Sequence, residues 1–192
     1  MKFLCALIAA ACLFINGCEP TKPPFNAVDI TGATGYGSDF RLTDHTGKPR
    51  TMADFHGKVV AIFFGFTQCP DVCPTTLSEM KQVMQLLGKD RDKLQVLFIT
   101  VDPKRDTQTL LSQYVPSFNP AFLGLYGDDA ATAKVAQDFK IFYRAVPGKT
   151  ADSYTIDHSA GMLVFDPQGR LRLFVNYGLT ADKIAADIKR LL

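Results

Sequence analysis

The sequence predicts an α/β domain with a mixed central β-sheet flanked by helices. Two continuous apolar runs, Val59–Phe64 and Val96–Ile99, are typical of strands buried on both faces of a sheet. A helical pattern lies between them, which implies a parallel pair joined by a right-handed crossover. Two later apolar runs, Met162–Phe165 and Leu171–Val175, flank a turn and predict an antiparallel hairpin in the same sheet.

The first elements precede and follow the strand at 59–64. Phe40–Thr43 alternates between apolar and polar residues like a half-buried edge strand, and Asp44–Gly47 follows as a turn, so we expect an N-terminal β-hairpin extension. After Cys73 and Pro74 the apolar residues recur at helical spacing, and Gly88 ends the helix. Its predicted buried face consists of Leu77, Met80, Met84 and Leu87.

Three more helices are predicted in the second half of the chain. Asp106 or Thr107 is placed to cap a short helix, and Thr180 is placed to cap the last one. The apolar positions are Leu110, Leu111 and Tyr114 in the first helix, Ala131, Val135 and Phe139 in the second, and Ile184, Ile188 and Leu191 in the third. Together with the turn at 166–169, this order of elements predicts the thioredoxin-like architecture.

Length and charge exclude several classes of protein. The chain has 192 residues, which suits one domain with a full core. A formal net charge of +2 argues against a nucleic-acid-binding protein, which carries a clustered basic excess. No apolar run reaches the roughly 18–20 residues of a membrane-spanning helix. We therefore expect no nucleic-acid partner, and membrane contact through a lipid anchor only.

The N-terminus predicts export. Residues 1–17 combine a lysine with a short apolar run, as a signal peptide does. The end of the run resembles the bacterial lipobox, which makes Cys18 the expected site of lipid attachment; ordinary cleavage nearby or an uncleaved anchor are the alternatives. Residues 18–25 contain three prolines and predict an extended tether, so the folded domain is expected at 26–192, on the periplasmic face of a bacterial membrane.

Cys69 and Cys73 carry the chemistry of the predicted domain. Each is followed by a proline, and the pair lies between a buried strand and the start of a helix. We expect Cys73 at or near the N-cap, where the helix dipole favours its thiolate. Two thiolates are soft ligands that suit Cu(I) and also zinc. Two buried structural cysteines, or a permanent structural disulfide closing a very short loop, are the alternatives.

A third ligand has to come from another part of the chain. Of the three histidines, His45 and His56 lie in predicted solvated loops. His158 lies just before the predicted strand at 162–165, and in a thioredoxin-like sheet the loop before that strand faces the start of the cysteine-bearing helix. We therefore expect His158 to complete the site, with Asp157 either orienting its ring or acting as a plain surface carboxylate.

Three motifs in order identify a resemblance. Cys69–Pro74, then Asp102–Thr107, then Asp157–Ser159 are similar to the motifs of the Sco/SenC family of copper proteins, over nearly the whole body of the chain. The resemblance implies a thioredoxin-like domain that binds Cu(I) or Cu(II) through Cys69, Cys73 and His158. It also implies a role in assembling the CuA centre of cytochrome c oxidase, with the CuA-bearing subunit as partner. Other copper chaperones and thiol reductants are further expected partners.

Other functions of the cysteine pair remain open from sequence. A thiol-disulfide oxidoreductase would use Cys69 and Cys73 as its catalytic redox pair, cycling through a Cys69–Cys73 disulfide, for example to reduce cysteines of an oxidase subunit. Three residues separate the cysteines, where thioredoxins have two, and residues 158–161 contain no proline where such enzymes place a cis-proline. Both departures favour metal binding. A redox or copper sensor would need the same site and is not separable from sequence.

Overall fold

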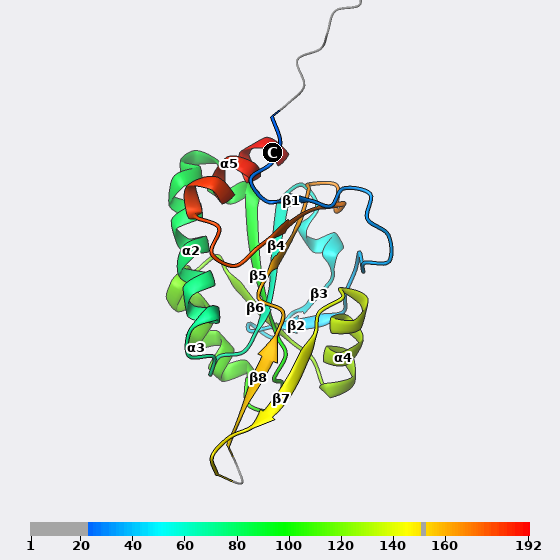
Figure 1. Cartoon of the computed structure of the whole chain (residues 1–192), viewed down its shortest axis with the longest axis vertical. Coiled ribbons are helices and arrows are strands. Elements are labelled where there is room, and N and C mark those ends of the chain that lie inside the picture. Colours follow the sequence, from blue (N-terminus) through cyan, green and yellow to red (C-terminus); the bar gives the residue numbers. More distant parts are fainter. Residues whose placement is uncertain (1–22, 151–152) are drawn as a thin grey trace, which may run out of the picture.

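The structure is a computed structural model that describes residues 23–150 and 153–192. An eight-stranded mixed sheet forms its centre, in the order β1-β10-β9-β4-β5-β6-β2-β3, and β7 and β8 form a separate two-stranded sheet. Helices α2, α3 and α5 lie on one side of the central sheet and α4 lies on the other (Figure 1). The thioredoxin-like α/β fold predicted from the sequence is confirmed.

The elements have the following bounds. The strands are β1 (Val28–Asp29), β2 (Leu42–Asp44), β3 (Pro49–Arg50), β4 (Val59–Gly65), β5 (Leu94–Thr100), β6 (Leu123–Tyr126), β7 (Tyr143–Pro147), β8 (Tyr154–His158), β9 (Met162–Phe165) and β10 (Leu171–Val175). The helices are α2 (Val72–Leu87), α3 (Gln108–Phe118), α4 (Asp129–Asp138) and α5 (Ala181–Leu191), with short 3-10 helices η1 (Met52–Phe55) and η2 (Gly88–Lys93).

The central strands follow the apolar runs of the sequence. Every residue of β4 and β5 is buried, and the two strands are parallel, with Val59 opposite Leu94. β9 pairs antiparallel with both β4 and β10. Burial on both faces accounts for the continuous apolar runs, because neither side of these strands meets water.

The helices also begin and end near their predicted signals. α2 ends at Gly88, whose φ of +58° suits a residue without a side chain, and its buried face includes the four predicted apolar residues. Of the two candidate caps for α3, Thr107 is the one used, and its hydroxyl accepts a hydrogen bond from Leu110 N–H. Thr180 occupies the N-cap of α5 without a capping bond from its side chain.

Several strands differ from the prediction. β1, β6 and the β7–β8 pair were not expected, because β1 and β6 are short and β7 and β8 present mostly half-buried or exposed residues. The predicted edge strand at 40–43 is shifted to Leu42–Asp44, and it lies between β6 and β3 instead of at the edge. The N-terminal hairpin is formed by β2 and β3.

The end of the predicted tether packs on the domain. The predicted signal peptide at 1–17, the predicted lipid-attachment residue Cys18 and the predicted tether up to residue 22 lie outside the described residues. Arg190 of α5 donates hydrogen bonds to the carbonyls of Pro23 and Pro24, and its guanidinium lies 3.9 Å from the centre of the Phe25 ring. Residues 23–25 therefore contact α5 of the folded domain, and the boundary at residue 26 stays a prediction.

Within residues 23–150 and 153–192, no helix has the length and apolar character needed to cross a bilayer.

Candidate metal centre

The two cysteines lie where β4 passes into α2. Cys69 is half-buried in the connecting loop, and its N–H donates to the carbonyl of Phe66. Cys73 has no solvent exposure and lies in the first turn of α2, beside Pro74. The N-cap is Asp71, so Cys73 lies two positions inside the helix and not at the cap itself.

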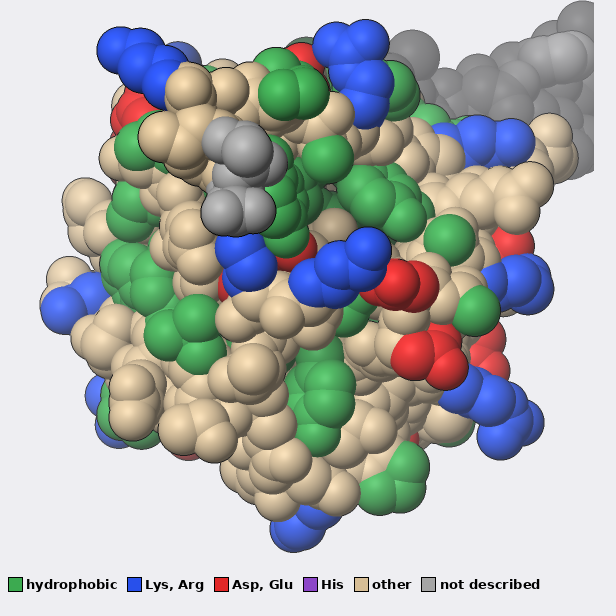
Figure 2. All heavy atoms as spheres, turned by 90° about the horizontal axis from the view of Figure 1, so that it is seen from below, with side chains coloured by type: hydrophobic (Ala, Val, Ile, Leu, Met, Phe, Trp, Pro, Cys, Tyr) green, Lys and Arg blue, Asp and Glu red, His purple; other side chains and the backbone are tan. Residues whose placement is uncertain are grey.

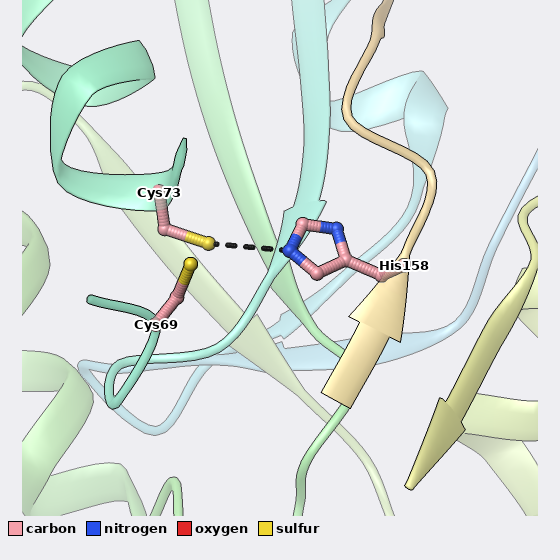
Figure 3. A group of neighbouring side chains, drawn as sticks. All are labelled: Cys69, Cys73 and His158. Carbon is pink, nitrogen blue, oxygen red and sulfur yellow. Dashed lines mark hydrogen bonds between the residues drawn. The ribbon is translucent and has the colours of Figure 1, made fainter. Parts of the chain in front are cut away.

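His158 reaches the cysteines from the end of β8. Its Nε2 lies 3.6 Å from Sγ of Cys73, and its ring points at both sulfurs (Figure 3). Nδ1 lies 2.9 Å from the carbonyl oxygen of Ser159. A carbonyl can only accept, so Nδ1 carries the proton of the neutral ring and the lone pair of Nε2 faces the thiol. Strand β8 thus presents a metal-binding nitrogen to the cysteine loop.

One atom from each of the three residues completes the cluster. The two sulfurs and a ring nitrogen all lie within 4.8 Å of one another, and both thiols are free. Two thiolates and a neutral imidazole are a soft donor set of the kind that Cu(I) prefers and that zinc also accepts. The cluster therefore could hold copper, with only small movements of the side chains.

Burial sets the protonation of the site. Loss of solvent raises the pKa of the Cys73 thiol well above its ordinary value, and the nearby Cys69 adds to this increase. In the metal-free state this burial opposes the thiolate that the helix start favours. Burial also lowers the pKa of His158, which keeps its ring neutral at pH 7. A metal ion would displace a proton from Cys73 and none from His158.

Asp157 pairs with an arginine, and no hydrogen bond joins it to the ring of His158. Its carboxylate is exposed and pairs with Arg144 at 3.2 Å. The partner of the His158 ring is the Ser159 carbonyl, a backbone group. These contacts favour the surface-carboxylate interpretation of Asp157.

The other two histidines lie elsewhere. His56 is exposed, as expected. His45 is half-buried and its Nδ1 accepts a hydrogen bond from Gly124 N–H at 3.0 Å, so it links β2 to β6 and is not a solvated loop residue. Burial lowers the pKa of His45.

Asp106 supports the cysteine loop, a role that the sequence reading missed. Its buried carboxylate accepts hydrogen bonds from the N–H and the hydroxyl of Thr67 and from the hydroxyl of Thr100. Thr67 lies two residues before Cys69, so Asp106 fixes the start of the loop. Its position in the sequence indicates this role. Asp106 follows β5 and the cysteine loop follows β4, and the ends of these parallel strands meet at the same edge of the sheet.

Comparison with known proteins decides the family. The family model described as SCO1/SenC matches residues 28–192. The chain belongs to the SCO1/SenC family.

Curated members of the SCO1/SenC family resemble the chain over most of its length. The mitochondrial SCO2 homolog of Mus musculus is 38% identical over 160 residues, which cover 82% of this chain and 62% of the relative. The SCO2-like protein of Rickettsia felis is 36% identical over 165 residues, with 85% and 80% covered. The chain thus spans about three fifths of the mouse relative's length.

Solved SCO1/SenC structures share the fold. Bradyrhizobium japonicum ScoI with copper bound is 44% identical and superimposes with a TM-score of 0.76, covering 82% of this chain and 99% of that one. Apo Sco1 from Thermus thermophilus is 36% identical with a TM-score of 0.77, covering 90% and 99%. These relatives occur both with copper and without it.

Proposed function

We propose that this chain is a copper carrier that binds one ion through Cys69, Cys73 and His158 and gives it to the CuA-bearing subunit of cytochrome c oxidase. The copper is cargo and not a resident cofactor. The observation that carries the proposal is the convergence of two free thiols and an unprotonated imidazole nitrogen within 4.8 Å. The copper-bound ScoI of Bradyrhizobium japonicum, 44% identical, supports the choice of metal.

The donor set suits both capture and release. Copper would be held by the two sulfurs after both thiols lose their protons, with the Nε2 lone pair of His158 as third ligand. Cys69 is the more accessible of the two cysteines and Cys73 is fully buried. An incoming thiolate of a recipient therefore meets the Cys69 side of the site first, and transfer proceeds by exchange of one ligand at a time.

The end of the molecule opposite the N-terminal segment carries no single charge sign (Figure 2). The end of the molecule from which the β7–β8 hairpin projects combines apolar side chains with separated basic and acidic ones (Figure 2). Recognition of the oxidase subunit, of other copper chaperones or of thiol reductants therefore depends on shape and ligand exchange more than on long-range attraction.

Location is part of the same proposal. Export by the signal peptide at 1–17 and lipid attachment at Cys18 would hold the domain on the periplasmic face of a bacterial membrane. The Rickettsia felis relative is also bacterial, which supports this setting. An oxidising compartment allows a Cys69–Cys73 disulfide to form. In that reaction the two thiols give two protons and two electrons to another disulfide, which is reduced to two thiols. The oxidised pair no longer binds copper.

The direct test is titration of the reduced protein with Cu(I) against a competing chelator. We expect one ion per chain, and loss of that stoichiometric binding in Cys69→Ser and in Cys73→Ser. Thr75→Ser, a conservative change in the same helical turn, is the control and should bind as the wild type does. Mixing two equivalents of the Cu(I)-loaded protein with a reduced, copper-free CuA domain, and then removing one electron per site with ferricyanide, should form the CuA absorption spectrum.

Two outcomes would contradict the proposal. Copper binding that survives the loss of either cysteine would place the metal elsewhere. Failure to load the CuA domain, together with rapid reduction of its disulfide by the copper-free protein, would instead favour the thiol-disulfide oxidoreductase.

A further inference from the structure

The strand that carries His158 is not part of the central sheet. β8 pairs only with β7, so no strand pairing connects it to β4 and the cysteine loop. The chain after His158 enters β9 within four residues, and β9 pairs with β4, so side-chain contacts act together with this backbone link to hold the 3.6 Å approach of His158 to Cys73. We propose that Arg105 is the positioning residue of the metal site, clamping the β7–β8 hairpin to the cysteine loop. This inference rests on the proposed copper site.

Arg105 contacts both parts of the site. Its Nη1 donates to the backbone carbonyl of Tyr154 at 2.8 Å and to Oε1 of Gln68 at 3.2 Å. Gln68 directly precedes Cys69, and Tyr154 is the first residue of β8. One guanidinium group therefore joins the strand of the histidine to the loop of the cysteine.

A second set of contacts fixes the guanidinium itself. Arg105 Nε donates to the carboxylate of Asp102, which is 3% exposed, and the Tyr154 hydroxyl donates to the same carboxylate at 2.8 Å. The guanidinium carbon lies 3.6 Å from the centre of the Tyr154 ring. Asp102, Arg105 and Tyr154 thus form a closed triangle of contacts, with the guanidinium carbon over the tyrosine ring.

The clamp also reaches the imidazole through packing. The Phe66 ring centre lies 5.7 Å from the guanidinium carbon of Arg105. The same ring forms a T-shaped contact with the His158 ring, with the centroids 5.8 Å apart. A shift of the arginine therefore changes the room available to the metal-binding ring, since packed side chains transmit displacement.

Only arginine can make this set of contacts. Bonds from Nε to Asp102 and from Nη1 to Tyr154 and Gln68 require a planar group with several donors at fixed angles. Lysine retains the charge but offers one compact ammonium and no flat face for the tyrosine ring. Arg105→Lys is therefore the informative substitution, because it removes the geometry and keeps the charge.

The experiment compares Arg105→Lys with Arg50→Lys in the full mature chain. Arg50 is a matched control, because it also binds a buried aspartate, Asp44, at 2.7 Å and lies over a phenylalanine ring, Phe55, away from the site. Two measurements are made: Cu(I) affinity with the thiolate-to-Cu(II) absorption band, and the alkylation rate of Cys73 in the metal-free reduced protein, read by peptide mass.

We expect Arg105→Lys to lower copper affinity about 10–100-fold, the usual cost of losing support behind a metal ligand, and to shift the absorption band. Alkylation of Cys73 should accelerate about tenfold, because the thiol is buried until the hairpin moves. Tyr154→Phe keeps the stacked ring and loses one hydrogen bond, so its effect should be intermediate. Arg50→Lys should lower the unfolding midpoint and leave both site measurements unchanged.

Two results would overturn the clamp. One is an alkylation rate of Cys73 in Arg105→Lys equal to that of the wild type. This result would refute the clamp whether or not the wild type binds copper. The other is unchanged copper affinity in Arg105→Lys when the wild type binds copper normally. Absence of copper binding in the wild type would count against the proposed function and leave the alkylation measurement to decide the clamp.

Discussion

Sγ of Cys73 lies 3.6 Å from Nε2 of His158, although 85 positions separate the two residues in the chain. The sulfur comes from the first turn of α2 and the nitrogen from the end of β8. The Ser159 carbonyl holds the proton of the ring on Nδ1. This contact is the basis of the proposed three-ligand site.

Replacement of His158 by alanine tests the third ligand. We expect copper to stay bound through the two thiolates but with affinity reduced at least about tenfold, or ~1.4 kcal/mol, because one donor is lost. The Cu(II) absorption band should also shift. Competition with a chelator measures the change. His56→Ala removes an exposed histidine and is the control. Equal affinity and identical spectra in His158→Ala and wild type would refute a role for the imidazole.

Gly65 makes room for the buried sulfur. A Cβ at this position would lie 2.6 Å from Sγ of Cys73 and 3.0 Å from the rings of Phe63 and Phe98. We expect Gly65→Ala to displace the sulfur, to lower the free energy of unfolding by about 1–3 kcal/mol, and to weaken copper binding.

Gly124→Ala is the matched control for that crowding. Its Cβ would lie 3.0 Å from Val115, in a strand that carries no ligand. Denaturant unfolding should show a loss of stability in both variants, and copper titration should show a weaker site in Gly65→Ala alone. Normal copper affinity in Gly65→Ala would mean that Cys73 can move without cost.

Asp44 should make the free energy of unfolding depend on pH in the acid range. Burial alone would raise its pKa, but hydrogen bonds from Thr46, Arg50 and Lys48 outweigh it and lower the pKa from 3.8 to about 2. Because the folded state favours the charged form, this stabilisation is complete above about pH 4 and is lost as the pH falls through 2. The shift corresponds to about 2 kcal/mol.

The measurement is the free energy of unfolding of wild type and Asp44→Asn at pH 7, 4 and 2.5. We expect Asp44→Asn to be less stable by about 2 kcal/mol at pH 7 and the difference to shrink below pH 4. Asp92→Asn, at a carboxylate that is 90% exposed, serves as control. A difference that stays constant across this range would show that the charge of Asp44 does not stabilise the fold.

Arg190 of α5 attaches residues 23–25 to the folded domain. It holds the carbonyls of Pro23 and Pro24 at 2.7 and 2.9 Å and lies over the Phe25 ring. We expect Arg190→Ala to release this segment and to speed chymotrypsin cleavage after Phe25 by about tenfold, since contacts of this kind contribute roughly 1–1.5 kcal/mol. Lys189→Ala, in the same helix, should cleave at the wild-type rate. Equal rates in both variants would exclude the attachment.

Local patterns in the sequence determined the central strands, the helices and the cysteine pair. The runs that became β4 and β5, the apolar spacing of α2 and the prolines after Cys69 and Cys73 depend on neighbours in the chain, so they can be read without coordinates. The position of His158 before the strand at 162–165 predicts that it lies near the cysteine pair, and in the structure its ring lies beside the two sulfurs.

Tertiary structure alone decided how the site is held and charged. β7 and β8 pair only with each other and bury little, so they leave no strong pattern in the sequence. The partner of the His158 ring is a backbone carbonyl, which no residue type reveals. The thiol of Cys73 stays protonated because of burial by residues distant in sequence, and burial depends on the whole fold, whereas the helix dipole is a local property.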